Sequence, residues 1–278
     1  MGNVACAITV ERTVRGVART LRTVSSVVLV GVSVGACSLL TDLSSLDADQ
    51  DDAGKQGTEG ADAGSDGTAP TPCVDGPNRF CSNFDEASPL TRWSMSDNVD
   101  GVLSTEAAGL SPPHALEARQ SAGGGWAAVG KDFDPAITGL RCELDMKFSG
   151  IPTNVGSEVD AFDLITSATG VEDHNLYFGC LSGQWQLLEF QTNPGSPTNL
   201  DRGVAVGTLP ENTWFHVVLD TTWSSVTFTA NGITVTLDGL KVPTTAKQRE
   251  LRVGLTYSTK NVTNASVFID NVDCTTTR

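Results

Sequence analysis

Strict alternation of apolar and polar side chains is the feature that most constrains this chain. The stretch "LRCELDMKF" alternates over its whole length, with charged residues at every second position. Its apolar set is Leu140, Cys142, Leu144, Met146 and Phe148. Successive side chains of a β-strand point to opposite faces, so this period predicts a strand with one buried face and one wet face.

Similar runs recur through residues 73–278, separated by Gly, Pro, Asn, Asp and Ser, and Asn231-Gly232 is a hairpin signal. No stretch keeps a helical period beyond one or two turns. About a dozen short strands in one segment of this length predict two packed antiparallel sheets. The expected fold is therefore all-β, a two-sheet antiparallel jelly-roll sandwich that forms a single domain.

The N-terminal segment has the pattern of an export signal. Four arginines precede an apolar run of 13 residues, Val24–Ala36, which is too short to span a bilayer. The run ends in Val34-Gly35-Ala36-Cys37, which resembles the bacterial lipobox. That resemblance implies a lipoprotein signal peptide at residues 1–36, lipidation of Cys37, and an exported protein anchored at the outer membrane or cell surface. The alternative is an ordinary signal peptide with a chance cysteine.

Residues 37–72 predict a tether. After Cys37 they contain eight acidic residues, one lysine and no aromatic residue. Such a composition cannot bury enough apolar surface to offset the entropy of ordering. We expect a flexible, self-repelling linker between the lipid anchor and the domain.

Charge and motifs exclude several functions. The formal net charge of −15 disfavours a nucleic-acid partner, and it leaves the lipid anchor as the expected contact with a membrane. The chain has neither a phosphate-binding loop nor a dinucleotide glycine fingerprint, and its three histidines are far apart in sequence.

Three segments together resemble the concanavalin A-like lectin/glucanase superfamily, in its laminin G-like form. They are "RFCSNFDE" with Trp93, "ENTWFHVVL" from Glu211, and "VFIDNV" from Val267. The resemblance implies a concanavalin A-like sandwich whose first and last strands pair. It also implies a structural Ca²⁺ held by Asp85, Glu86 and Asp270, because this cation prefers oxygen ligands. In the alternative, Asp270 accepts hydrogen bonds from backbone amides.

The stretch "SEVDAFDLI" resembles the acidic signature of laminarinase-type glucanases through Glu158, Asp160 and Asp163. A retaining glycosidase needs two carboxyl groups about 5–5.5 Å apart. Here Asp163 is one methylene shorter than Glu, and without a β-bulge it points to the opposite face. We therefore expect no working catalytic pair, with a laminarinase-like hydrolase or polysaccharide lyase as the alternative.

Binding without cleavage requires only planar polar groups and aromatic platforms on one face. The predicted ligand-binding set is Arg141, Glu158, Asp160, Asn175, Tyr177 and Trp185. Trp185 follows a turn, and the sequence leaves open whether it faces solvent or the core. The expected partner is a polysaccharide or a glycoprotein. A structural envelope protein that contacts another protein is the remaining alternative.

Exported cysteines are expected to form disulfides. Cys142 and Cys180 are both in phase with apolar neighbours and so point into the core, which predicts that they pair; the alternative is two buried thiols on non-adjacent strands. Cys81 is expected to pair with Cys73 across a short loop or with Cys274 across the terminal strands.

Overall fold

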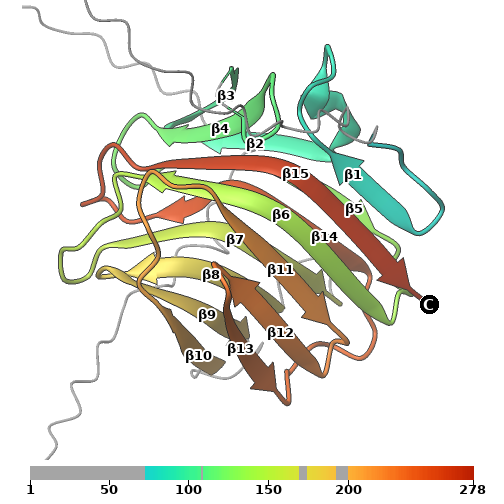
Figure 1. The fold of residues 1–278 in the computed structure, drawn as a ribbon. Coiled ribbons are helices and arrows are strands. Elements are labelled where there is room, and N and C mark those ends of the chain that lie inside the picture. The colour runs from blue at the N-terminus through green and yellow to red at the C-terminus, as the bar shows by residue number, and fades with distance from the viewer. Residues whose placement is uncertain (1–72, 108, 169–173, 192–199) are drawn as a thin grey trace, which may run out of the picture. The chain divides into compact units, whose positions relative to one another are not determined.

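The computed structural model describes residues 73–278 except 108, 169–173 and 192–199. The predicted signal peptide, the lipidation site Cys37 and the tether 37–72 lie outside these residues. The described part consists of two antiparallel sheets packed against each other and one short 3-10 helix, η1 (Pro89–Arg92). No helix in it is long and apolar enough to cross a membrane. The prediction of an all-β, two-sheet antiparallel sandwich is confirmed (Figure 1).

The eight-stranded sheet lies in front in Figure 1. Seven of its strands follow one another in space, and β1 (Arg79–Ser82) is added beside β15. Their order is β13 (Ile233–Asp238), β12 (Ser225–Ala230), β11 (Phe215–Thr221), β6 (Gly139–Ser149), β15 (Ser266–Thr277), β4 (Ala115–Gln120) and β3 (Gly101–Glu106).

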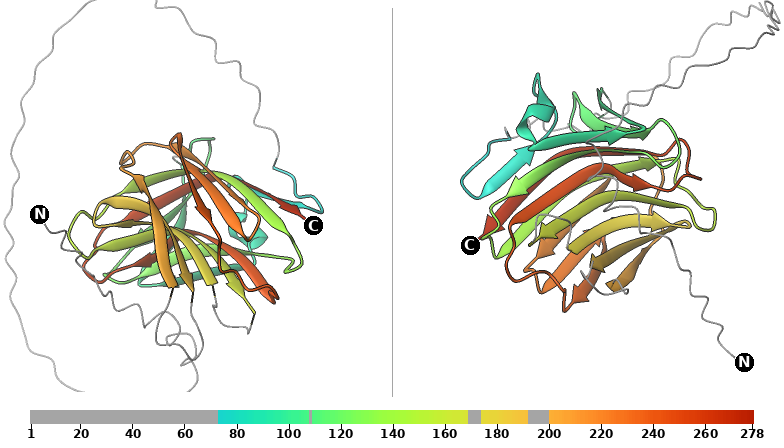
Figure 2. Two further views of the ribbon diagram at one scale, coloured as in Figure 1. Left: turned by 90° about the horizontal axis from the view of Figure 1, so that it is seen from below. Right: turned by 180° about the vertical axis from the view of Figure 1, so that it is seen from behind.

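The seven-stranded sheet forms the second layer, which is nearer the viewer in the right-hand view of Figure 2. Its order is β10 (Leu200–Gly207), β9 (Gln184–Gln191), β8 (His174–Leu181), β7 (Glu158–Ser167), β14 (Gln248–Ser258), β5 (Trp126–Phe133) and β2 (Met95–Val99). Strands distant in sequence, such as β7 and β14, lie side by side at its centre.

The hydrophobic core fills the space between the sheets. The predicted alternating run lies within β6, where Leu144 and Met146 are fully buried. Across the core, Trp185 of β9 stacks on Phe148 of β6 with ring centroids 4.0 Å apart, and on Phe178 of β8 at 4.9 Å. Large aromatic side chains bury the most apolar area per residue, so this group ties the sheets together.

The first and last strands of the domain pair, as the family resemblance implied. Phe80 of β1 lies opposite Cys274 of β15, and Arg79 forms a two-point ion pair with Asp273. Phe80 also contacts the buried ring of Trp93 at a centroid distance of 5.0 Å. β1 is therefore held both by backbone pairing and by aromatic packing.

The disulfides confirm one pairing and correct the other. Cys73 bonds Cys81, as predicted. Cys142 bonds Cys274 rather than Cys180, which is a free, buried thiol. Cys142 and Cys274 are directly opposite each other on the neighbouring strands β6 and β15, whereas Cys180 belongs to β8 of the other sheet. Burial raises the pKa of the Cys180 thiol to about 11.

A buried charged cluster links the seven-stranded sheet to the chain that follows β13. Glu189 is fully buried, and it accepts hydrogen bonds from Arg202 Nε at 2.5 Å and from the Lys241 amide. His174 Nε2 lies 2.8 Å from the same carboxylate. Burial alone would raise the pKa of Glu189, but the hydrogen bonds from His174, Lys241 and Arg202 outweigh it and lower this pKa.

Candidate functional site

The outer face of β7 carries the acidic residues of the glucanase-like motif. Val159, Phe162 and Leu164 belong to the hydrophobic core, so the alternate positions point away from it. The register with β8 shifts between Asp160 and Phe162, which leaves one extra residue, a β-bulge, in β7. The bulged alternative therefore applies, and Asp163 does not point to the opposite face.

The bulge brings three carboxylates to one side of the sheet. Glu158 and Asp160 lie before the extra residue and Asp163 lies after it, and all three share the outer face. Their exposed fractions are 1%, 0% and 4%. Desolvated carboxylates exert a stronger field than carboxylates in water, because the local dielectric constant is lower.

Glycines of neighbouring strands make room for two acids of this face. A Cβ at Gly179 of β8 would lie 2.1 Å from Asp160 Oδ1. A Cβ at Gly130 of β5 would lie 2.6 Å from Glu250 Oε1. No side chain larger than glycine fits at either position unless the carboxylate moves, so backbone and carboxylates are packed closely here.

β8 adds Tyr177 and Asn175 to the face. Tyr177 lies opposite Asp163, and Asn175 lies opposite Ile165, which is outside the core cluster. Asn175 is 3% exposed, and its Oδ1 has no hydrogen-bond partner among the described residues. A buried amide oxygen without a donor is costly, so this position favours a ligand that donates a hydrogen bond.

β14 supplies a residue pair that sequence reasoning missed. Arg252 lies opposite Asp163, and its Nε and Nη2 donate to the two carboxylate oxygens of Glu250 at 2.5 and 2.9 Å. The sequence signal was present in "ELRVGLTY", where Glu250 and Arg252 alternate with the core residues Leu251 and Val253. The alternation by itself predicts a strand and does not reveal the ion pair.

Aromatic residues flank the acidic positions. Tyr257 of β14 lies opposite Asp160, and Trp126 of β5 donates its indole N–H to Asp97 of β2 at 3.3 Å. Both aromatic side chains are partly exposed. Tyr177 and Tyr257 are the two tyrosines of the whole sequence, so both lie in the strands that border β7.

Two members of the predicted ligand set do not join this face. Trp185 is 1% exposed and packs in the core, because it lies opposite Cys180 on the inner side of the sheet. Arg141 belongs to β6 in the other sheet, where it contacts Glu143 and Asp220. The remaining four, Glu158, Asp160, Asn175 and Tyr177, lie on neighbouring strands of one face.

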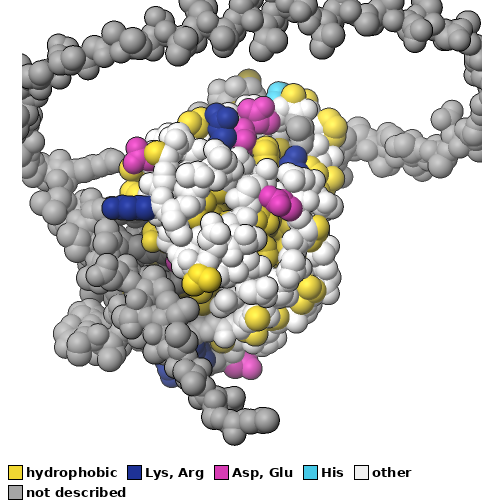
Figure 3. All heavy atoms as spheres, turned by 90° about the vertical axis from the view of Figure 1, so that its left-hand side faces the viewer, with side chains coloured by type: hydrophobic (Ala, Val, Ile, Leu, Met, Phe, Trp, Pro, Cys, Tyr) yellow, Lys and Arg dark blue, Asp and Glu magenta, His cyan; other side chains and the backbone are white. Residues whose placement is uncertain are grey.

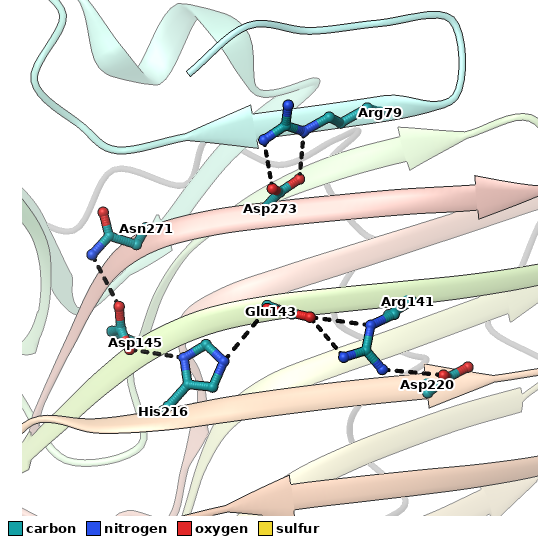
Figure 4. Close-up of polar contacts among 8 residues, drawn as sticks. All are labelled: Arg79, Arg141, Glu143, Asp145, His216, Asp220, Asn271 and Asp273. Atoms are coloured by element: carbon teal, nitrogen blue, oxygen red, sulfur yellow. Dashed lines mark hydrogen bonds and ion pairs between the residues drawn. The ribbon is translucent and has the colours of Figure 1, made fainter. Parts of the chain in front are cut away.

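Arg141 is part of a row of polar contacts across the eight-stranded sheet, shown in Figure 4. His216 of β11 reaches Asp145 at 3.0 Å and Glu143 at 3.6 Å, and Asp145 accepts a hydrogen bond from Asn271 of β15. These side chains contact one another across strands and stabilise the register. The row is thus accounted for as cross-strand pairing.

The predicted calcium ligands are brought together only in part. Asp270 accepts hydrogen bonds from the Ser111 amide and hydroxyl and from the Asn271 amide. Burial raises the pKa of Asp270, and the negative charge of Asp85 raises it further. Glu86 instead pairs with Arg92 at 2.5 Å. No group of three His, Cys, Asp or Glu residues suited to a metal occurs within the described ranges.

The end of the domain shown in Figure 3 differs from the acidic face. On this surface, separate hydrophobic side chains are surrounded by uncharged polar side chains and backbone, and charged side chains are few. Among the large hydrophobic residues that the structure describes, Val155 has the most exposed side chain of the whole domain, at 85%. The outer face of the seven-stranded sheet is therefore the stronger candidate, because several buried polar groups converge on it.

Comparison with known proteins supports the fold class and goes no further. No protein-family model and no curated protein matches this sequence. Among solved structures, the cellulose-induced protein Cip1 aligns with 72% of this chain and 98% of its own, at TM-score 0.50 and 11% identity. A structure of botulinum neurotoxin type C, which enters cells through interaction with two ganglioside molecules, aligns with 71% of this chain at TM-score 0.49 and 13% identity.

The chain spans about half the length of the botulinum neurotoxin structures that it matches, 47% in that case. At 11% identity, the likeness to Cip1 concerns the arrangement of strands. The class of protein that fold and comparison define is a two-sheet antiparallel β-sandwich.

Proposed function

We propose that this chain is a non-catalytic, glycan-binding β-sandwich of the concanavalin A-like type, displayed at the cell surface by a lipid anchor. The observation that carries the proposal is the outer face of the seven-stranded sheet, where carboxylates, Tyr177 and the unpartnered amide oxygen of Asn175 converge. Planar polar groups with neighbouring aromatic rings are the usual means of binding sugar hydroxyl groups and ring faces. The partner is a polysaccharide or the glycan of a glycoprotein.

The test is a panel of soluble polysaccharides assayed with the full-length chain for binding and for new reducing ends. We expect binding to at least one glycan, lost in Asn175→Ala and kept in Asp238→Asn, which changes an exposed residue of the other sheet. A folded protein that binds nothing across the panel would contradict the proposal. That result would favour the alternative of a structural envelope protein that contacts another protein.

Hydrolysis remains a second candidate because of the β-bulge. The bulge places Asp163 on the same face as Glu158, which is the geometric condition that a double displacement requires. The shorter side chain of Asp163 argues against it, because the two carboxyl groups must approach within about 5–5.5 Å. New reducing ends that disappear in Glu158→Gln would establish the hydrolase and reject binding without turnover.

We also propose lipidation of Cys37, supported by the lipobox-like sequence that precedes it. The acylated cysteine would anchor the chain at the membrane through the acidic tether. Replacing Cys37 with Ala is expected to move the protein from the membrane fraction to the soluble fraction. Unchanged membrane retention would reject the anchor without affecting the glycan proposal.

A structural Ca²⁺ is proposed at Asp85 and Asp270. The mutual repulsion of these carboxylates, which contributes to the raised pKa of Asp270, is the property that a bound cation would relieve. Glu86 is engaged by Arg92, so the site would draw its further oxygen ligands from other groups. Thermal melts with calcium and with a chelator test the ion, and identical melting temperatures would exclude it.

A further inference from the structure

The inner side of the seven-stranded sheet ends in a row of polar side chains. Five neighbouring strands, labelled in Figure 1, each contribute one residue to it. The residues are Arg202 of β10, Glu189 of β9, His174 of β8, Thr166 of β7 and Arg249 of β14. Each lies two positions along its strand from a residue that belongs to the core or packs against it. The row therefore points between the two sheets, away from the outer face proposed to bind glycans.

The carboxylate of Glu189 is already compensated. It accepts hydrogen bonds from Arg202 Nε and from the Lys241 amide. A carboxylate only accepts hydrogen bonds, so His174 Nε2, which lies 2.8 Å from it, is the donor in that contact. The other ring nitrogen of His174, Nδ1, is left to face the rest of the row.

Three polar atoms of the row are buried without a partner. Arg249 Nη1, Thr166 Oγ1 and His174 Nδ1 have no hydrogen-bond partner in the described part of the chain. Their residues are 6%, 1% and 3% exposed. They lie on consecutive strands in direct register, because Thr166 is opposite Arg249 on one side and opposite His174 on the other. Each unpartnered buried group costs free energy, so three in one row indicate a site that a further molecule completes.

The charge of Arg249 distinguishes this site from a place for buried water. Its Nε donates to the Pro135 carbonyl at 3.0 Å, and its guanidinium lies 3.7 Å from the centre of the Trp223 ring. Both groups are neutral, and burial lowers the pKa of Arg249. An isolated buried charge is far more costly than an unpaired polar group. Water would satisfy the hydrogen bonds of the row, whereas an anion would satisfy the hydrogen bonds and the charge.

Trp223 holds the guanidinium in place. This residue lies between β11 and β12 with φ of 65°, a left-handed conformation that is strained for a bulky side chain. Its indole N–H donates to the Ile137 carbonyl at 2.9 Å, and its ring is only partly exposed. Stacking on an aromatic ring engages the face of a guanidinium and leaves its edge for hydrogen bonds in the plane. Trp223 thus orients Arg249 without giving Nη1 a partner.

We propose that Arg249, Thr166 and His174 form a binding site for a small oxyanion, a carboxylate or a sulfate, between the sheets at the end of the core. Arg249 Nη1 and the Thr166 hydroxyl donate to its oxygens. His174 donates through Nδ1 when both ring nitrogens carry a proton, while Nε2 stays bonded to Glu189. The oxyanion is either a free inorganic ion or the carboxylate of an acidic sugar, and the two sources share this chemistry.

Calorimetric titration of the full-length chain with sodium sulfate and with sodium glucuronate tests the site, in a constant background of sodium chloride. We expect saturable binding of at least one of the two anions. Glucose, which lacks the carboxylate of glucuronate, should not bind here. Tighter binding of sulfate identifies a free inorganic ion as the ligand, and tighter binding of glucuronate identifies an acidic sugar.

Variants assign the binding to the row. Arg249→Met removes the charge from an unbranched side chain and should weaken anion binding about tenfold or more. Thr166→Val keeps a similar shape without the hydroxyl and should weaken it about threefold. Arg141→Met is the matched control, because Arg141 is half exposed on the other sheet. Melting curves show that each variant is folded, and Thr166→Val keeps the test valid where Arg249→Met does not fold.

Melting temperatures provide a second measurement. Sulfate raises the stability of many proteins by exclusion from their surfaces, and this general effect is the same in all variants. A bound anion adds stability only where the site is intact. The rise in melting temperature with sulfate should therefore be larger in the wild type and in Arg141→Met than in Arg249→Met.

Two outcomes would overturn the site. Absence of saturable binding, or equal affinity in the wild type and Arg249→Met, would assign the three atoms to buried water. Binding that appears only after Glu172→Gln with Asp173→Asn would show that the chain supplies its own counter-charge from the residues that precede His174 in sequence. Neither outcome bears on the glycan proposal, which concerns the opposite side of the sheet.

Discussion

The Cys142–Cys274 disulfide is expected to contribute more to stability than Cys73–Cys81, because it closes a much longer loop. The two bridges span 132 and 8 residues. The chain-entropy relation for cross-links gives about 5 kcal/mol for the long loop and about 2.5 kcal/mol for the short one. The predicted difference between the two double-alanine variants is therefore about 2.5 kcal/mol.

Urea unfolding of the full-length chain, followed by tryptophan fluorescence, measures the free energy of unfolding of each variant. Removing buried sulfur atoms also leaves small cavities, which lower stability. The loss of unfolding free energy in Cys180→Ala measures this cavity effect alone, because the Cys180 thiol is buried but not cross-linked. After this correction, Cys142→Ala with Cys274→Ala should be the less stable protein. Equal losses for the two bridges would refute the argument from loop length.

Three further changes have defined outcomes. Glu189→Gln should lower the free energy of unfolding by about 3 kcal/mol at neutral pH. Because the pKa of Glu189 is lowered in the folded protein, its carboxylate stabilises the fold above the ordinary Glu pKa, and this contribution is lost as the pH falls through the native pKa. The variant should therefore lose less stability on acidification than the wild type and the control Asp238→Asn, and an unchanged acid profile would contradict the argument. Gly179→Ala should weaken glycan binding about tenfold, because the Cβ of the new alanine would lie 2.1 Å from Asp160 Oδ1 and would displace that carboxylate. Unaltered glycan affinity in a binding titration would show that Asp160 is not part of the site. Asp270→Asn should abolish any rise in melting temperature that calcium produces, and a rise that persists would place the ion elsewhere.

Much of the fold was predictable from local periodicity. The alternation from Leu140 to Phe148 predicted both the strand β6 and its buried face, because side-chain direction follows from backbone pleat alone. The same reasoning placed Cys142 and Cys180 in the core. It did not identify the partner of Cys142, because strands of both sheets point side chains into one core and only the strand order distinguishes them.

The candidate site was predictable only in part. The acids of β7 were identified, but one extra residue between Asp160 and Phe162 reversed the direction of Asp163. A bulge changes every side-chain direction after it and leaves no clear pattern in a run as apolar as this one. Trp185 is a second residue whose direction the sequence did not predict. A nearby turn does not determine whether a side chain points to the core or to solvent, whereas the register of Trp185 opposite Cys180 places it on the inner face.

The pairing of β1 with β15 has a mechanical consequence. Tension applied through the residues that precede Cys73 reaches Cys81 directly through the disulfide and bypasses the loop between them. From Cys81 the load passes into β1, whose backbone hydrogen bonds and Arg79–Asp273 ion pair connect it to β15. β15 is in turn bonded covalently to β6 at Cys274. A pulling force on this end of the domain is thus passed through β1 to β15, which lies between β6 and β4 inside the eight-stranded sheet.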